Sequence, residues 1–318
     1  MIGSDAGSSK RPTPRFMAVG ECMVEMAPLG EAPDAFRMGF AGDTFNTAWY
    51  ARRLLPEAAR VGYVSAVGDD DVSERMLRFM DAAGVETDHV ARIAGRTVGL
   101  YLIALSDGER SFSYWRSASA ARRLAHHLPD PSSIGASETV VHVSGITLAI
   151  LPPADRERLV EWMGRARARG ATVSFDPNVR PRLWEGADAI RDWVERGARA
   201  ASTVLPSLDE EARDFGTQGA EAVADRYLGW GAGTVAVKNG AEPGLLATSD
   251  GRRERFACER VERVVDTTAA GDSFNAGFLA ARMRGEDESG SIRHAVRLAA
   301  RVVQHRGALV APNAASPA

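Results

Sequence analysis

Apolar and polar positions along the chain fall into short strand-like runs that alternate with longer helix-like runs. The short runs are bounded by small or polar residues, as is typical of buried strands. They cover residues 16–20, 61–68, 139–144, 172–175, 203–205 and 234–237. From residue 138 on, they alternate with helical patterns such as 292–305. This rhythm predicts a parallel sheet with helical crossovers, and therefore an α/β fold.

Two segments have a pattern of their own. Residues 98–115 alternate apolar and polar positions around the sequence Ser-Asp-Gly-Glu at 106–109, which predicts a β-hairpin. Residues 146–151 prolong the apolar run 139–144, and we expect them to continue that strand. Pro152 and Pro153 then begin a helix.

The composition is that of an ordinary globular protein. The 318 residues are 45% hydrophobic and 25% charged, with a formal net charge of −3. The absence of a Lys/Arg-rich run argues against nucleic acid and anionic membranes as partners. Two distant cysteines and the lack of an apolar run of about 18 residues predict a reduced, cytoplasmic protein without a membrane span. We expect disorder in 1–15 and 313–318, and one domain over 16–312.

The stretch 264–284 (VVDTTAAGDSFNAGFLAARMR) carries the clearest chemistry. A strand end runs into a turn of small residues, and a helical apolar pattern follows. The free amides and positive dipole end of such a helix start favour an anion such as a phosphate. Asp272 lies at the same helix start, where it can take a proton from an attacking hydroxyl group. The simpler alternative is a loop with an Asp N-cap.

The run D-T-T-A-A-G-D-S-F-N-A-G-F resembles the C-terminal signature of the ribokinase (PfkB) family of sugar kinases. The resemblance implies a ribokinase-like three-layer α/β sandwich, with a mostly parallel central sheet and a small β lid built from segments near 21–40 and 96–118. It implies Asp272 as the catalytic base and an anion hole at Ala269, Ala270 and Gly271. The family's first glycine is replaced by Ala269, which can serve only if its backbone does not need a positive φ.

The segment G-D-T-F-N-T-A resembles the family's N-terminal sugar-binding signature, and this implies that Gly42, Asp43 and Asn46 contact the sugar. Asp43 and Asn46 are three residues apart, so one helix face can carry both. A helix cap is the alternative for this pair.

The hairpin resembles the family's lid, whose inner face is expected to carry Tyr101, Tyr114 or Trp115, and Arg116. An ordinary surface hairpin with cross-strand aromatic pairs is the alternative.

Two further runs, Y-W-R-S-A-S-A-A and F-D-P-N-V-R-P-R-L-W, resemble the 2-keto-3-deoxygluconate kinases of this family. Their arginines, Arg116 and Arg180, suit a carboxylate-bearing sugar, because a guanidinium can bind both carboxylate oxygens. Asn178 and Arg180 follow a parallel strand, where such sheets bind ligands, and are candidates for phosphate contact. For Arg180, a surface salt bridge is the alternative.

The nucleotide side of the site rests on weaker patterns. The turn K-N-G-A-E-P-G resembles the family's nucleotide-binding turn and implies contacts from Lys238, Gly240, Ala241 and Gly244, although it is not a Walker A loop. Many relatives have N-x-x-E where this chain has Ser207 and Glu210. Ser207 is thereby a candidate nucleotide contact. Glu210 can hold Mg²⁺ through water, or simply favour a helix start.

Together the resemblance implies ATP-dependent phosphorylation of 2-keto-3-deoxy-D-gluconate to its 6-phosphate, with Mg²⁺ and an optional monovalent cation. The implied partners are the sugar acid, ATP and a second copy of the chain joined through the lid. Another sugar, such as fructose, ribose or a nucleoside, remains an alternative substrate. A non-catalytic sugar-binding relative is the other alternative.

Overall fold

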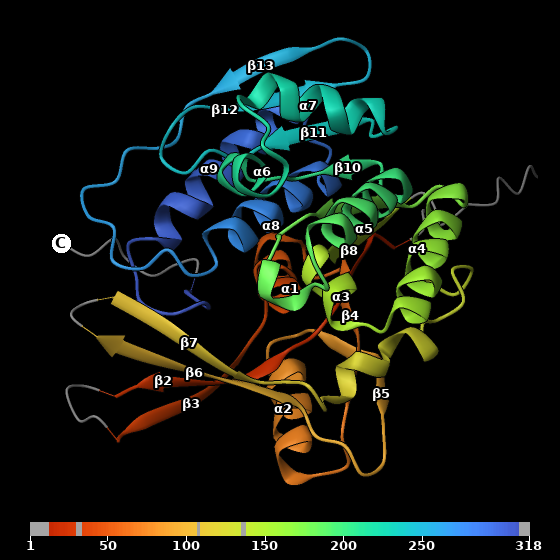
Figure 1. The fold of residues 1–318 in the computed structure, drawn as a ribbon, viewed down its shortest axis with the longest axis vertical. Coiled ribbons are helices and arrows are strands. Elements are labelled where there is room, and N and C mark those ends of the chain that lie inside the picture. The colour runs from red at the N-terminus through yellow and green to blue at the C-terminus, as the bar shows by residue number, and fades with distance from the viewer. Residues whose placement is uncertain (1–12, 30–33, 107–108, 135–137, 312–318) are drawn as a thin grey trace, which may run out of the picture.

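The computed structural model describes residues 13–29, 34–106, 109–134 and 138–311, and within these ranges the chain forms a nine-stranded and a four-stranded sheet. The larger sheet lies between two layers of helices, and the smaller sheet projects from its side (Figure 1). The strands of the nine-stranded sheet, in spatial order, are β13 (Arg253–Phe256), β12 (Gly244–Thr248), β11 (Thr234–Val237), β10 (Thr203–Val204), β9 (Thr172–Asp176), β8 (Thr139–Ser144), β1 (Arg15–Val19), β4 (Arg60–Val67) and β5 (Glu86–Arg92).

Seven neighbouring strands, from β11 to β5, are parallel among the described residues, and β12 and β13 add an antiparallel edge. The chain passes from β1 outward to β4 and β5, then returns to the other side of β1 at β8. The strand order therefore reverses between β1 and β8. Open α/β sheets bind ligands at the carboxyl ends of the strands beside such a reversal.

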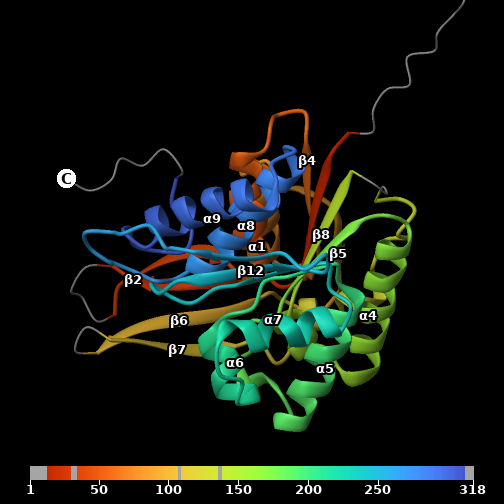
Figure 2. The same ribbon diagram turned by 90° about the horizontal axis from the view of Figure 1, so that it is seen from above.

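Each face of the large sheet has its own apolar core, covered by its own helices (Figure 2). One face carries α1 (Asp43–Leu54), α2 (Asp71–Ala82), α8 (Ala270–Met283) and α9 (Glu288–Val302). The other carries α3 (Gly145–Ile150), α4 (Pro153–Ala168), α5 (Ala187–Ala200), α6 (Leu208–Phe215) and α7 (Ala220–Gly229), with the 3₁₀ turns η1 (Ala120–His126) and η2 (Pro181–Leu183). None of the helices in the described ranges is long and apolar enough to cross a bilayer.

The four-stranded sheet is the expected lid. Its order is β3 (Phe36–Ala41), β2 (Met23–Pro28), β6 (Gly99–Ser106) and β7 (Glu109–Trp115). The predicted hairpin is confirmed as the antiparallel pair β6 and β7. Asp107 and Gly108, expected at its turn, lie outside the described residues.

The α/β class and the predicted strands are confirmed, but one prediction was wrong. Residues 145–150 form the buried helix α3 rather than a continuation of β8. The Ser144 side chain accepts a hydrogen bond from the amide of Ile146 at 3.0 Å and thereby caps a helix there. An apolar run of this length does not distinguish a buried strand from a buried helix. In addition, Arg15, expected in the N-terminal extension, already belongs to β1.

Candidate active site

The site lies where the N-termini of α1 and α8 meet the carboxyl ends of β1, β8 and β9. Gly42 precedes α1, and a Cβ atom on it would come within 2.2 Å of the Glu21 carbonyl oxygen, so only glycine allows this close approach. Asp43 then begins α1 directly above the end of β8, as its contact with Ser144 shows. The sheet reversal and two helix starts thus converge on one place.

Asp272, the predicted base, stands in the first turn of α8 and is held from α1. Asn46 donates from Nδ2 to Asp272 Oδ2 at 2.8 Å, and Thr47 donates to the Asp272 backbone oxygen at 3.3 Å. Burial and the nearby Asp43 carboxylate raise the pKa of Asp272 from 3.8 to about 7, although the Asn46 hydrogen bond opposes this. A carboxyl group with a pKa near neutrality suits a general base.

Asp43 is held by donors from two strand ends. The Ser144 hydroxyl at the end of β8 donates to Asp43 Oδ2, and Asn178 after β9 donates to the same oxygen at 2.9 Å. Asn178 has a positive φ of 36°, which asparagine tolerates better than most residues. Its amide also bonds Asp176 Oδ1 at 3.1 Å.

Behind Asn178 lies a buried charged cluster, in which Lys238, expected as a nucleotide contact, meets Asp176 and Asn275, which were not predicted. Lys238 Nζ donates to Asp176 Oδ2 at 2.7 Å and to Asn275 Oδ1 at 3.3 Å. Asn275, on α8, donates to the same Asp176 oxygen at 2.6 Å. In the sequence, Asp176 shows only as an acid at the end of an apolar strand, and Asn275 only as a polar residue in an apolar helix.

In the turn before α8, the backbone of Ala269 has a conformation that residues with a Cβ disfavour. This residue has φ of 60° and ψ of 15°, so the left-handed conformation that glycine prefers is adopted by a residue with a Cβ. The condition stated for Ala269 in the anion hole, a backbone that does not need a positive φ, is therefore not met.

One of the three expected anion-hole amides is already bonded within the turn. The Ala270 amide donates to the Thr267 carbonyl oxygen at 3.1 Å. Within the described part of the chain, the amides of Gly271 and Asp272 have no acceptor, so these two are the better anion-binding groups.

The lid brings Tyr101, Tyr114 and Arg116 together on one side. Tyr101 and Tyr114 are directly opposite in the β6–β7 register, with ring centroids 6.0 Å apart, and the Arg116 guanidinium lies 6.0 Å from the Tyr114 ring. Trp115 is opposite Leu100, and strand alternation places it on the other face. Of the two alternatives, Tyr114 is therefore the one that shares a face with Tyr101.

Two carboxylates, one between β1 and β2 and one on β2, hold these lid residues and were not predicted. Arg116 Nε donates to Glu21 Oε2 at 2.8 Å, and Nη2 bonds the same oxygen. The Tyr101 hydroxyl donates to Glu25 Oε2 at 2.5 Å. Glu21 is buried, and Arg116 is thus paired with an acid whose position is fixed.

Arg180 and Glu210 bind each other. Arg180 Nη1 lies 2.5 Å from Glu210 Oε1, and the Val179 amide donates to Glu210 Oε2 at 2.9 Å. The salt bridge considered as an alternative for Arg180 therefore exists. Both oxygens of Glu210 are engaged, and the described residues contain no group of three or more His, Cys, Asp or Glu side chains fit to hold a metal.

The turn that was expected to bind the nucleotide is only partly exposed. Gly240 has a φ of 55° in an exposed turn with Ala241, and Ser207 before α6 bridges to Lys238 through the backbone. Gly244 is buried, and a Cβ there would come within 2.2 Å of the Phe256 ring. Core packing is sufficient to account for that glycine.

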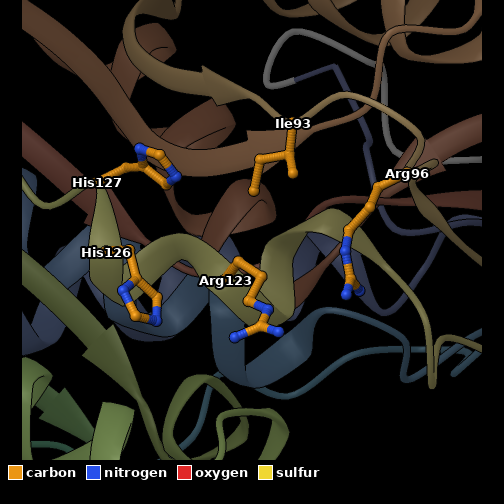
Figure 3. Close-up of a pocket in the computed structure, with 5 residues that line it drawn as sticks. All are labelled: Ile93, Arg96, Arg123, His126 and His127. Carbon is orange, nitrogen blue, oxygen red and sulfur yellow. The ribbon is translucent and has the colours of Figure 1, made fainter.

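A surface pocket of about 350 Å³ lies elsewhere, between the loop after β5 and η1 (Figure 3). It is lined by Ile93, Arg96, Arg123, His126 and His127. None of these residues bonds to the network around Asp272 within the described ranges, and none supplies a carboxylate. This pocket therefore lacks a carboxylate like that of Asp272 at the start of α8.

Known proteins resemble the chain over nearly its whole length. The model of the pfkB family carbohydrate kinases matches residues 13–314. The 2-dehydro-3-deoxygluconokinase of Dickeya dadantii (strain 3937) is 36% identical over 313 residues, covering 96% of this chain and 99% of that protein. The fructokinase of Rhizobium leguminosarum bv. trifolii is 31% identical over 272 residues, covering 83% and 78%.

A solved structure extends the similarity to three dimensions. Aminoimidazole riboside kinase from Salmonella enterica, complexed with aminoimidazole riboside and an ATP analog, has a TM-score of 0.81 and 25% identity, covering 94% of this chain and 97% of that chain. Because the structural match covers 94% of this chain, it extends over both the sandwich and the lid described above. The chain therefore belongs to the pfkB family of carbohydrate kinases.

Proposed function

We propose that the chain transfers the γ-phosphoryl group of ATP to the 6-hydroxyl group of 2-keto-3-deoxy-D-gluconate, the compound also called 2-dehydro-3-deoxygluconate. The observation that carries the proposal is the Asp272 carboxyl group, held by Asn46 at the open start of α8. The relative from Dickeya dadantii bears the name of this activity and covers almost the whole chain.

The proposed chemistry relies on positioning and charge. Asp272 accepts the proton of the attacking hydroxyl group, and the free amides of Gly271 and Asp272 bind the phosphoryl oxygens. Phosphoryl transfer needs little covalent participation from the protein, because in-line geometry and charge stabilisation supply most of the catalysis.

The sugar acid is proposed to lie between α1 and the lid. Asp43 and Asn46 face its hydroxyl groups, with Gly42 allowing the close approach, and Tyr101 and Tyr114 cover it. Its carboxylate binds Arg116 and Arg180. Each guanidinium has five N–H donors, so the existing bonds to Glu21 and Glu210 leave donors for a substrate.

ATP and Mg²⁺ are the proposed cofactors. Lys238, Gly240, Ala241, Ser207 and Asn178 are the proposed contacts on the nucleotide side. Mg²⁺ bound to ATP keeps much of its water and is held mainly by phosphate oxygens, which fits a site without a dedicated protein cage. Any contact of Glu210 with such a hydrated ion runs through water, because its two oxygens already bind Arg180 and the Val179 amide. A monovalent cation is an optional addition.

A neutral sugar is the second candidate substrate, because a fructokinase is 31% identical over most of the chain. The two arginines favour the acid, since a neutral hexose has no group that needs them. A non-catalytic sugar-binding relative is disfavoured by the retained Asp272.

We further propose that the protein works in the cytoplasm, where ATP is available, and as a dimer. Trp115 of β7 is 60% exposed on the lid face opposite Tyr101 and Tyr114, and a second copy covering that face would bury it. Sedimentation of the pure protein at micromolar concentration tests this, and a monomer would contradict it.

Product analysis tests the proposed reaction. The protein, MgATP and 2-keto-3-deoxygluconate are incubated, and the product is examined by ³¹P and ¹³C nuclear magnetic resonance. We expect a phosphomonoester on carbon 6 and an equal amount of ADP. Phosphorylation at another carbon, or no phosphoryl transfer, would contradict the proposal.

A further inference from the structure

Lys238, already a proposed nucleotide contact, is held at the start of α8 by Asp176 and Asn275, two residues that the proposed chemistry does not use. The cluster joins three elements: Asp176 ends β9, Lys238 follows β11, and Asn275 lies one turn into α8. Asp176 and Asn275 are 4% and 1% exposed, and the Lys238 side chain is 13% exposed. A buried ion pair is weak evidence for stability, because desolvation offsets much of the attraction. Its placement therefore calls for another explanation.

The ammonium group lies beside the proposed anion hole. A Cβ atom built on Gly271 would lie 3.5 Å from Lys238 Nζ, and the Gly271 amide is one of the two without an acceptor. An ammonium group has three N–H donors, and the described residues occupy two of them, through Asp176 and Asn275. One donor therefore remains for a ligand at the helix start.

We propose that Lys238 binds the phosphoryl group during its transfer, and that Asp176 and Asn275 are positioning residues that hold the ammonium group in place. This inference rests on the proposed phosphoryl transfer. A cation fixed beforehand in a site of low dielectric stabilises developing charge without reorganising at the moment of reaction.

The state of Asp176 supports the proposal. Its carboxylate receives hydrogen bonds from Lys238, from the Asn275 side chain and from the Asn178 amide. Although burial opposes it, the charge of Lys238 lowers the pKa of Asp176. Asp176 thus remains ionised and holds the ammonium group in position, rather than acting as a second base.

A purely structural role is the competing explanation, since the cluster ties β9 and β11 to α8. Three variants separate the two roles. Lys238→Met leaves Asp176 buried without its countercharge, so the melting temperature should fall. The double variant Asp176→Asn/Lys238→Met removes both charges and should recover most of that loss. Lys238→Gln keeps an amide donor for Asp176 but has no charge. It keeps the proposal testable if the double variant does not fold.

The experiment measures kcat for ATP and 2-keto-3-deoxygluconate together with the melting temperature. We expect the double variant and Lys238→Gln to melt near the wild type, yet to turn over about 100-fold more slowly. For Lys238→Gln we also expect the acid limb of kcat/KM to move to higher pH, because Lys238 lowers the pKa of Asp272. The double variant does not share this prediction, because it also removes Asp176, which raises the pKa of Asp272. Folded variants with turnover within about 3-fold of the wild type would overturn the role of Lys238. A wild-type protein that phosphorylates no sugar would instead overturn the proposed function.

Discussion

Asn46 donates a hydrogen bond to Asp272 across 2.8 Å and so joins the first turn of α1 to the first turn of α8. Both helices repeat the same spacing, with Asp43 and Asn46 on α1 and Asp272 and Asn275 on α8. Asn275 binds Asp176, and Asn178 carries the connection back to Asp43. The expected sugar-binding segment and the expected base therefore belong to one ring, closed by side-chain hydrogen bonds and by the helix turns that join Asp43 to Asn46 and Asp272 to Asn275.

Replacing Asp272 by Asn should abolish most turnover without loss of folding. The general base is lost, so we expect kcat to fall by about 10²- to 10⁴-fold. Turnover near the wild-type value would remove Asp272 as the base.

The same variant should change stability in a pH-dependent way. The Asp272 pKa is about 7 in the folded protein and 3.8 without the fold, so folding favours the protonated form. Wild-type stability should thus decline relative to Asp272→Asn as the pH rises from about 4 to about 7. Chemical denaturation at pH 4, 5.5 and 7 measures this difference, and a constant difference would contradict the shifted pKa.

The pH dependence of activity should report the same group. We expect kcat/KM of the wild type to rise with slope one and level off near pH 7, because Asp272 acts only when ionised. Asn46→Ala removes a hydrogen bond that lowers the Asp272 pKa, so its acid limb should shift to higher pH. An unshifted limb would contradict the role given to Asn46.

Ala269→Gly should be tolerated or stabilising. The φ of 60° costs a residue with a Cβ about 1–2 kcal/mol, and glycine avoids this at a smaller entropic cost. Ala270→Gly is the matched control: it starts the helix without a positive φ and should destabilise by up to about 1 kcal/mol. Thermal unfolding compares the stabilities of the two variants. An equal loss of stability in both would show that the turn at Ala269 carries no strain.

Arg116→Met should act on the acid substrate more than on a neutral one. Losing a charge-assisted hydrogen bond costs about 1.5–3 kcal/mol, so we expect KM for 2-keto-3-deoxygluconate to rise about 10- to 100-fold. The effect on any residual fructose turnover should be smaller. Because Glu21 then stays buried without its partner, Glu21→Gln/Arg116→Met is the control for folding. Equal effects on both sugars would contradict carboxylate binding by Arg116.

Glu210→Gln separates two roles of one carboxylate. If Glu210 chiefly positions Arg180, KM for the sugar acid should rise while the Mg²⁺ dependence stays unchanged, and the direct bond at 2.5 Å favours this result. Titration of activity with Mg²⁺ at fixed ATP is the measurement. A several-fold higher Mg²⁺ requirement with unchanged sugar KM would assign Glu210 to the ion instead.

The sequence was informative where chemistry lies in contiguous motifs. Asp272, Asp43 and Asn46 were predicted from short runs, and the strands of the sheet from their apolar pattern. Asp176 and Asn275 were missed because their bond joins positions 99 residues apart, and only the fold brings them together. Glu21 was missed as a partner of Arg116 for the same reason, with a separation of 95 residues.

Local conformation was the other limit. Residues 145–150 are mostly apolar, and such a short run does not show by its periodicity whether it forms a strand or a helix. The Ser144 cap favours the helix. Ala269 adopts a backbone conformation that its residue type disfavours. Neither feature can be read from residue preferences alone.

Substrate preference tests the central claim most directly. ATP consumption by the pure protein with Mg²⁺ is measured side by side for 2-keto-3-deoxygluconate, fructose, ribose and aminoimidazole riboside. We expect kcat/KM for the keto acid to exceed each of the others by at least about 100-fold, consistent with a bound carboxylate. A higher kcat/KM for a neutral sugar would contradict the proposed substrate and show that Arg116 and Arg180 serve another purpose.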